Sequence, residues 1–355
     1  MPIALVASPT AIVSFCLAVI SSTFTTSSVV ADDPALPGSW TPARTTVSVT
    51  RDDGSTFAAE VHYPATDGAS GSPIDLENGP YPIAAFGHGF LCPVDRYRST
   101  AGHLASWGIV VILPESQGGL FPSHAAFAAD LATSLDWLDA EGDRKGSFWS
   151  DAIDGSERGL LGHSMGGGAA LLAAAGNADV DAVCVLAAAN TIPSSIAAAS
   201  NVRCATRLLV GEDDAIVPPS STSSMYGNLA GPKQDVAILG GFHCGFLDDP
   251  ILFCDSGSIS RGEQLAIVRR EVTEFLLLYL RDDLGRWNQV WDPMASGEGV
   301  TQVDRVTADL DGNGRVDGGD LGLLVANWEK SGCGDLNEDG IVTGADLGLL
   351  IAAWK

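Results

Sequence analysis

Residues 159–168 read Gly-Leu-Leu-Gly-His-Ser-Met-Gly-Gly-Gly and contain the pattern Gly-x-Ser-x-Gly, centred on Ser164. An apolar run precedes the pattern and an Ala- and Gly-rich stretch follows it. This order predicts a buried strand, a sharp turn and a helix beginning at Met165. Small residues on both sides of Ser164 permit the turn and leave its hydroxyl exposed. The stretch therefore predicts a nucleophilic serine at the carboxyl end of a strand.

Short apolar runs alternate with amphipathic stretches along the chain, after a hairpin signal at Asp52-Asp53-Gly54. Such runs are typical of strands that helices cover on both faces. The expected strands are 45–49, 57–63, 82–86, 109–113, 159–162, 182–189, 206–211 and 236–239, and the expected helices are 96–106, 124–140, 165–175, 220–229 and 262–281. The alternation predicts an α/β fold with a mostly parallel sheet and right-handed crossovers. The segment 190–205 is too short for a lid domain, so we expect an open site that suits bulky or polymeric esters.

A serine nucleophile needs a general base and an orienting carboxylate, and in this kind of fold the chain order is serine, acid, histidine. Of the six histidines, only His243 follows Ser164, and it lies in a loop just past the last expected strand. The acid should follow the preceding strand, where three candidates stand in a row: Glu212, Asp213 and Asp214. Asp214 is preferred because the later position reaches further toward His243.

Two backbone N–H groups are expected to stabilise a developing oxyanion. One belongs to Met165, the residue after the nucleophile, and the other to Phe90, in the loop after the strand at 82–86. His88, in the same loop, is expected to be structural or to face the substrate. Catalysis of this kind needs no cofactor.

Four motifs resemble the bacterial cutinase, polyester hydrolase (PETase) and chlorophyllase/dienelactone-hydrolase-like group over about residues 40–285. They are the His-Gly-Phe loop, Gly-His-Ser-Met-Gly-Gly-Gly, Asp214-Ala-Ile-Val-Pro and the loop around His243. By position, the resemblance implies an α/β-hydrolase with the triad Ser164, Asp214 and His243 and the same two oxyanion donors. Polyester hydrolases place a Trp after the strand that follows the nucleophile helix. Residues 187–191 hold no aromatic residue, so stacking on an aromatic polyester is not expected.

A repeat lies near the C-terminus, where residues 309–328 match residues 335–354. Each copy places oxygen ligands at loop positions 1, 3, 5, 9 and 12, a main-chain carbonyl at position 7 and Gly at position 6, a spacing that suits calcium. The expected ligands are Asp309, Asp311, Asn313, Arg315 (carbonyl), Asp317 and Asp320 in the first loop, and Asp335, Asn337, Asp339, Ile341 (carbonyl), Thr343 and Asp346 in the second. Asp at position 12 and a Leu-rich helix after each loop resemble a type I dockerin. The resemblance implies two Ca²⁺ ions and a cohesin-like protein partner.

The N-terminal residues predict export. An apolar run at 11–20 and small residues up to Ala31 are typical of a secretory signal peptide, which predicts a secreted or cell-surface protein. Disulfides form in that environment, and the expected pair is Cys244 with Cys254, which share one loop. Cys184 with Cys204 is a second candidate pair.

The chain has 19 basic and 44 acidic residues, a formal net charge of −25, which disfavours nucleic acid as a partner. No apolar run is long enough to span a bilayer. The expected domains are a signal peptide (1–31), an α/β-hydrolase domain (38–294), a linker (295–306) and a dockerin-like module (307–355).

The expected activity is hydrolysis of carboxylic esters through an acyl-enzyme. The dockerin-like repeats suggest a polysaccharide-side-chain esterase, acting on acetyl or feruloyl groups, as an alternative. A serine peptidase is disfavoured because the sequence contains no propeller or cap domain. From another class, a non-catalytic, calcium-dependent anchoring protein stays open.

Overall fold

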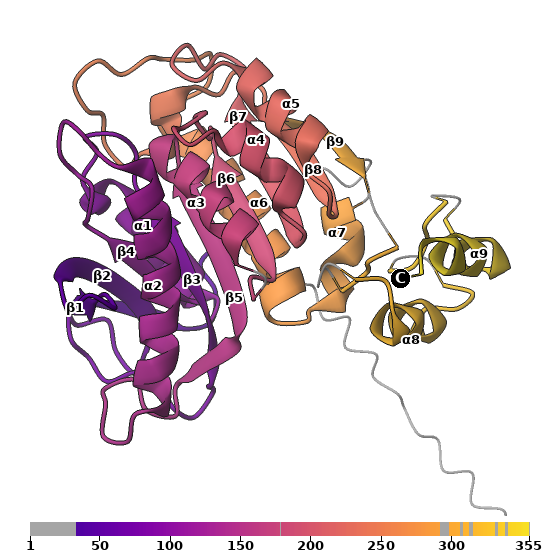
Figure 1. Ribbon diagram of the computed structural model, residues 1–355, viewed down its shortest axis with the longest axis horizontal. Coiled ribbons are helices and arrows are strands. Elements are labelled where there is room, and N and C mark those ends of the chain that lie inside the picture. Colours follow the sequence, from indigo (N-terminus) through magenta and orange to yellow (C-terminus); the bar gives the residue numbers. More distant parts are fainter. Residues whose placement is uncertain are drawn as a thin grey trace, which may run out of the picture. The chain divides into compact units, whose positions relative to one another are not determined.

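A nine-stranded sheet forms the centre of the computed structural model, with the strand order β1-β2-β4-β3-β5-β6-β7-β8-β9 (Figure 1). The structure describes residues 33–177, 179–291, 298–305, 308–311, 315–330, 333–337 and 340–354. The signal peptide expected at 1–31 lies outside these residues. So do two of the expected calcium ligands, Asn313 and Asp339.

The sequence predicted the main elements in their order. The strands are β1 (Thr41–Thr50), β2 (Thr56–Ala65), β3 (Tyr81–Gly87), β4 (Val110–Pro114), β5 (Ile153–His163), β6 (Ala182–Leu186), β7 (Ala205–Gly211), β8 (Lys233–Ile238) and β9 (Val300–Arg305). The helices are α1 (Arg98–Ser106), α2 (His124–Asp143), α3 (Met165–Gly176), α4 (Ser195–Ala198), α5 (Pro219–Asn228), α6 (Arg261–Leu280), α7 (Trp287–Trp291), α8 (Gly318–Ala326) and α9 (Gly344–Ala353).

The sheet is mostly parallel, as expected. Strands β3 to β8 pair in parallel, whereas β1 pairs with β2, β2 with β4 and β9 with β8 in antiparallel fashion. Every residue of β3, β4, β6 and β7 is buried, because helices cover both faces of these strands. Parallel strands end at the same edge of a sheet, so the loops that follow β3, β5, β7 and β8 meet there.

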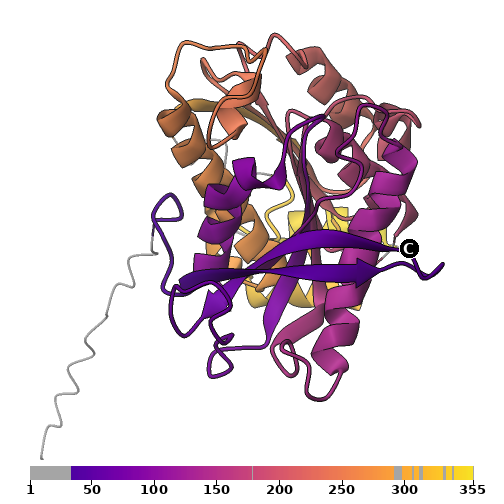
Figure 2. The ribbon, with the colours of Figure 1, turned by 90° about the vertical axis from the view of Figure 1, so that its left-hand side faces the viewer.

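Two separate cores lie on the two faces of the sheet. Leu104 of α1 and Phe275 of α6 belong to one core, and Leu131 of α2 and Leu171 of α3 belong to the other. Figure 2 shows α1 and α6 on one side of the strands and α2 on the other. The segment between β6 and β7 holds only the short helix α4 and a 3-10 turn, Ala199–Asn201.

The linker expected at 295–306 is wrong in part, because Val300–Arg305 form strand β9. Its backbone pairs with β8 from Val300 opposite Ile238 to Arg305 opposite Lys233. Without β9, β8 would be an edge strand with a row of unpaired N–H and C=O groups, which another strand readily satisfies. Val300, Thr301 and Val303 are β-branched and fit such a strand.

The structure contains the disulfide between Cys244 and Cys254 that the sequence predicted. The second candidate pair was wrong, because Cys184 and Cys204 are both free. Cys184 packs in the core on the α1 and α6 face, whereas Cys204 packs in the core on the opposite face. The sheet separates the two sulfur atoms.

Helices α8 and α9 follow the two repeated loops and begin in the same way. Asp317 and Asp320 form a capping box at the first, and Thr343 and Asp346 form one at the second. The sequence repeat is therefore a structural repeat as well. Over the part of the chain that the structure describes, no helix is long and apolar enough to cross a membrane.

Candidate functional site

Ser164 lies at the turn between β5 and α3, where the sequence placed it. Its backbone has φ 55° and ψ −118°, a conformation that residues with a Cβ rarely adopt. The backbone N–H of Ser164 donates to Leu186 O at 2.9 Å and its carbonyl accepts from Gly168 N–H at 3.1 Å. The turn is thus fixed from both sides in a strained conformation.

A close approach of two glycines brings the loop after β3 onto the start of α3. A Cβ built on Gly166 would lie 2.1 Å from Gly87 O, and one built on Gly87 would lie 2.8 Å from Gly166 Cα. Neither position therefore has room for a side chain. The contact holds the loop that carries Phe90 beside the turn that carries Ser164.

His243 and Asp214 are hydrogen-bonded to each other. Nδ1 of His243 donates to Oδ2 of Asp214 at 2.8 Å, and both side chains are buried. The other carboxylate oxygen of Asp214 accepts the N–H groups of Ile216 at 2.9 Å and Val217 at 2.7 Å. With both oxygens engaged, Asp214 holds the imidazole in one orientation and leaves Nε2 for another partner.

The two alternative acids have other partners. Glu212 accepts the N–H of Gly240 at 3.1 Å, and Asp213 accepts the N–H and the hydroxyl of Ser258 at 2.9 and 2.7 Å. Of the three carboxylates in the row, Asp214 is the one that bonds to His243. Glu212 and Asp213 instead fix the loops around it.

The rings of His163, adjacent to Ser164 in the chain, and His243 lie 4.5 Å apart between centroids. Within the described residues, the Ser164 hydroxyl forms no hydrogen bond. Such contacts in an enzyme without substrate are often loose and tighten when substrate binds. Burial lowers the pKa of His163 well below its usual value, so this second imidazole stays neutral beside His243.

The two expected oxyanion donors lie on the loop and the helix that the glycine contact joins. Within the described part of the chain, neither the N–H of Phe90 nor that of Met165 donates a hydrogen bond, so both are available to a ligand. His88, in the same loop, is structural: its Nδ1 lies 2.8 Å from Gly89 O and its Nε2 lies 2.9 Å from Ser116 O.

Tyr97 is a residue that sequence reasoning missed. Its hydroxyl accepts the N–H of Gly89 at 2.9 Å and donates to Nδ1 of His163 at 2.9 Å. It therefore links the loop that carries Phe90 to the residue before Ser164. No local pattern marks Tyr97, because one of its partners, His163, is 66 residues away in the chain; its place just after the His88 loop is a hint.

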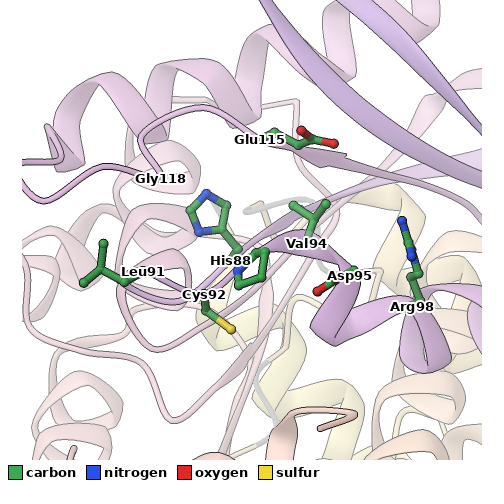
Figure 3. Close-up of a pocket in the computed structure, with 9 residues that line it drawn as sticks. His88, Leu91, Cys92, Val94, Asp95, Arg98, Glu115 and Gly118 are labelled. Carbon is green, nitrogen blue, oxygen red and sulfur yellow. The ribbon is translucent and has the colours of Figure 1, made fainter. Parts of the chain in front are cut away.

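A pocket of about 390 Å³ adjoins the Phe90 loop (Figure 3). Apolar and charged groups line it together: His88, Leu91, Cys92, Pro93, Val94, Asp95, Arg98, Glu115 and Gly118. Ser164, Asp214 and His243 are not among these residues. The pocket therefore lies beside the candidate active site, next to the loop that carries Phe90, and does not contain that site.

Exposed apolar side chains stand on the loops at the same edge of the sheet as Ser164. Phe121 follows β4 and is 97% exposed, Ile192 follows β6 and is 84% exposed, and Phe253 follows β8 and is 88% exposed. Ile192 lies just past the stretch in which polyester hydrolases have a Trp. The loops at this edge of the sheet therefore expose apolar side chains, whereas residues 187–191 contain no aromatic residue.

The first repeated loop brings three of the expected ligands close together. Carboxylate oxygens of Asp309, Asp311 and Asp320 all lie within 4.8 Å of one another, a spacing that one cation can bridge. In the second loop, Asp346 takes the place of Asp320: each accepts two N–H groups at the start of its loop. Hard oxygen donors of this kind fit calcium. The remaining expected ligands within the described residues lie on these same loops: Arg315, Asp317, Asp335, Asn337, Ile341 and Thr343.

Comparisons with known proteins agree with this geometry. Lipase 1 of Moraxella sp. (strain TA144) is 31% identical over 184 residues, which make up 52% of this chain and 52% of that lipase. The chain thus matches about half the length of this relative. A family profile described as "PETase: PET hydrolase-like" matches residues 26–247, more than half of the chain. The match covers the Phe90 loop, the Ser164 turn, Asp214 and His243, and the chain belongs to the PET hydrolase-like family.

Proposed function

We propose that this protein is a serine hydrolase of carboxylic esters that works through an acyl-enzyme. The observation that carries the proposal is the buried hydrogen bond between His243 Nδ1 and Asp214 Oδ2, at the sheet edge where the strained Ser164 turn also lies. An imidazole oriented in this way can take a proton at Nε2. The family match and the lipase relative support the same chemistry.

In the proposed reaction, Ser164 Oγ attacks the ester carbonyl while His243 Nε2 takes its proton. The carboxylate of Asp214 stabilises the imidazolium that forms. The N–H groups of Phe90 and Met165 donate to the oxyanion of the tetrahedral intermediate. His243 then protonates the leaving alcohol, and water, activated in the same way, releases the acid.

The exposed apolar loops favour an apolar ester that reaches the site from an open surface. Phe121, Ile192 and Phe253 would contact such a substrate around the reacting carbonyl, and burying their side chains on it is favourable. An insoluble or polymeric aliphatic ester fits this arrangement. Residues 187–191 supply no aromatic ring, so we do not propose an aromatic polyester.

The activity test compares Ser164→Ala with the wild type on p-nitrophenyl butyrate. We expect kcat to fall by at least about 10³-fold, because the nucleophile is gone and only oxyanion stabilisation remains. Ser220→Ala, which removes an exposed hydroxyl on α5, is the matched control and should retain wild-type turnover. Turnover that survives in Ser164→Ala would refute the proposal. A wild-type protein that no fluorophosphonate probe labels would favour the non-catalytic anchoring protein instead.

We further propose that the C-terminal repeats bind two Ca²⁺ ions and attach the secreted enzyme to a cohesin-like protein. The clustered carboxylates of Asp309, Asp311 and Asp320 support the first site, and the matching hydrogen bonds of Asp346 support the second. When bound, calcium would hold each loop closed and fix the helix after it. It would take no part in the ester chemistry.

The repeats also favour a second candidate, an esterase that removes acetyl or feruloyl groups from polysaccharides. Activity on acetyl-xylan, on a feruloyl ester and on an aliphatic polyester film separates the two candidates. Release of acetate or ferulate at a kcat/KM well above that for p-nitrophenyl butyrate would favour the polysaccharide esterase.

A further inference from the structure

One carboxylate outside the candidate triad binds the backbone of the two loops that carry His243 and Asp214. Asp255 Oδ2 accepts the N–H of His243 at 2.9 Å and the N–H of Ala215 at 3.2 Å. Its Oδ1 accepts the N–H of Cys244 at 2.9 Å. Ala215 follows Asp214 directly, so one side chain joins the backbones beside both members of the buried pair.

The chain around Asp255 is itself held in place. Asp255 follows Cys254, whose sulfur is bonded to Cys244, the residue after His243. On the other side of Asp255, the N–H of Ser258 donates to Gly240 O at 2.9 Å, and its hydroxyl donates to Asp213. A covalent bond and hydrogen bonds therefore fix the position of the carboxylate.

The N–H groups at the start of the turn that carries His243 are bound by this carboxylate. His243 begins a short 3-10 turn, His243–Phe246, in which the first N–H groups have no acceptor within the turn. Asp255 supplies acceptors for two of them. The residue before, Phe242, is held by the side-chain amide of Gln264, which bonds both its N–H and its carbonyl at 2.9 Å. On the other side of His243, the carbonyl of Cys244 accepts from Arg261 Nε at 3.3 Å. Within the described residues, the acceptor for the N–H groups of both His243 and Cys244 is Asp255.

We propose that Asp255 is a positioning residue for the proposed ester hydrolysis: anchored by the Cys244–Cys254 disulfide, it fixes His243 against Asp214. It touches neither the substrate nor the reacting atoms. Its carboxylate fixes the backbone position from which the His243 imidazole reaches Ser164 and Asp214. The inference rests on the proposed function and adds to it a residue that no catalytic motif contains.

The test measures kcat, KM and the thermal midpoint of Asp255→Ala and Asp255→Asn with p-nitrophenyl butyrate. A misplacement of the base by about 1 Å can cost on the order of 100-fold in rate. We therefore expect kcat of Asp255→Ala to fall by about 10- to 100-fold while KM stays within about twofold. Asp255→Asn is isosteric and keeps one acceptor oxygen, so it should fold like the wild type and lose less activity.

Asp249→Asn is the matched control. It removes an exposed carboxylate from the same disulfide loop, one that pairs with Arg96 at 3.2 Å, and should leave kcat unchanged. A folded Asp255→Ala variant with wild-type kcat would overturn the inference. So would a fall in kcat that is accompanied by a proportionate rise in KM and fall in the thermal midpoint, because that is the result of a merely structural role. A wild-type protein that hydrolyses no ester would count against the proposed function, not against Asp255.

A double variant tests the link to the disulfide. If Cys254 acts by anchoring Asp255, then Asp255→Ala combined with Cys254→Ser should lose little more kcat than the worse single variant, because both changes release the same contact. Losses that multiply would show that the disulfide and Asp255 act independently, which contradicts the proposed anchoring.

Discussion

Replacing Ser164 by glycine should abolish ester hydrolysis and yet stabilise the fold. Ser164 adopts φ 55° and ψ −118°, which is unfavourable for any residue with a Cβ and accessible to glycine. Strain of this kind costs about 1–3 kcal/mol per residue. The substitution relieves this strain, but about 0.5–1 kcal/mol of the relief is lost again, because glycine has more conformational freedom in the unfolded chain.

The net gain in the free energy of unfolding therefore lies between about 0 and 2.5 kcal/mol. Within the described residues the Ser164 hydroxyl forms no hydrogen bond, so the substitution breaks no side-chain contact of this type. Ser164→Ala is the matched comparison, since it removes the same hydroxyl but keeps the Cβ and the strain. Its stability should lie close to that of the wild type.

Differential scanning calorimetry of the three proteins tests this reasoning. A gain of 1 kcal/mol corresponds to a shift in the midpoint of about 2–4 °C for domains of roughly 150–250 residues, and of about 1–2 °C for this longer chain. We expect the glycine variant to unfold at the highest temperature and the alanine variant to match the wild type. A glycine variant that is less stable than the alanine variant would refute the claim that the turn is strained.

Three further predictions concern other parts of the molecule. Asp214→Asn should lower kcat by roughly 10³- to 10⁴-fold in steady-state assays, because an amide no longer holds the imidazole in the required tautomer; a loss below tenfold would speak against the pair. Burial raises the pKa of Glu157 to about 7 and that of Asp181 to about 6, and the charges of nearby carboxylates add to both effects. A carboxyl whose pKa is raised on folding destabilises the fold once it ionises. The stability of the fold with Glu157 protonated is therefore fully present below about pH 4.5 and falls as pH rises to about 7. Glu157→Gln should reduce that loss by about 1 kcal/mol, after allowance for solvent screening, in urea titrations at pH 5 and pH 8; equal losses in both proteins would contradict it. Isothermal titration with Ca²⁺ should find two sites in the wild type and one in Asp320→Ala, and two sites in the variant would show that the first loop binds calcium without that carboxylate.

The sequence was sufficient to predict the turn at Ser164 and the mostly parallel sheet around it, and it singled out His243 as the candidate base. Each rests on local pattern or chain order: small residues around Ser164, apolar runs before it, and a lone histidine after it. Of the three carboxylates after β7, Asp214 is the furthest along the chain, and it is the one that bonds to His243, in the loop after β8.

Contacts between distant segments could not be predicted in the same way. Tyr97 binds His163, 66 residues away, and Asp255 binds Ala215, 40 residues away, and neither Tyr97 nor Asp255 stands in a recognisable motif. Strand β9 escaped prediction because its pairing depends on the open edge of β8, not on a strong apolar run of its own. The rejected pair Cys184 and Cys204 failed for a related reason: spacing alone does not say which face of a sheet a cysteine occupies.

The pairing of β9 with β8 gives the enzyme a mechanical property. If the repeats tether the protein to a partner, the chain that leads to them passes through β9, so tension on the tether enters the sheet along the β8–β9 ladder. Strand β8 leads directly into the loop of His243. Hydrodynamic drag or the motion of a substrate particle would thus strain the strand that leads to His243, and the β8–β9 hydrogen bonds would be the first to resist that force.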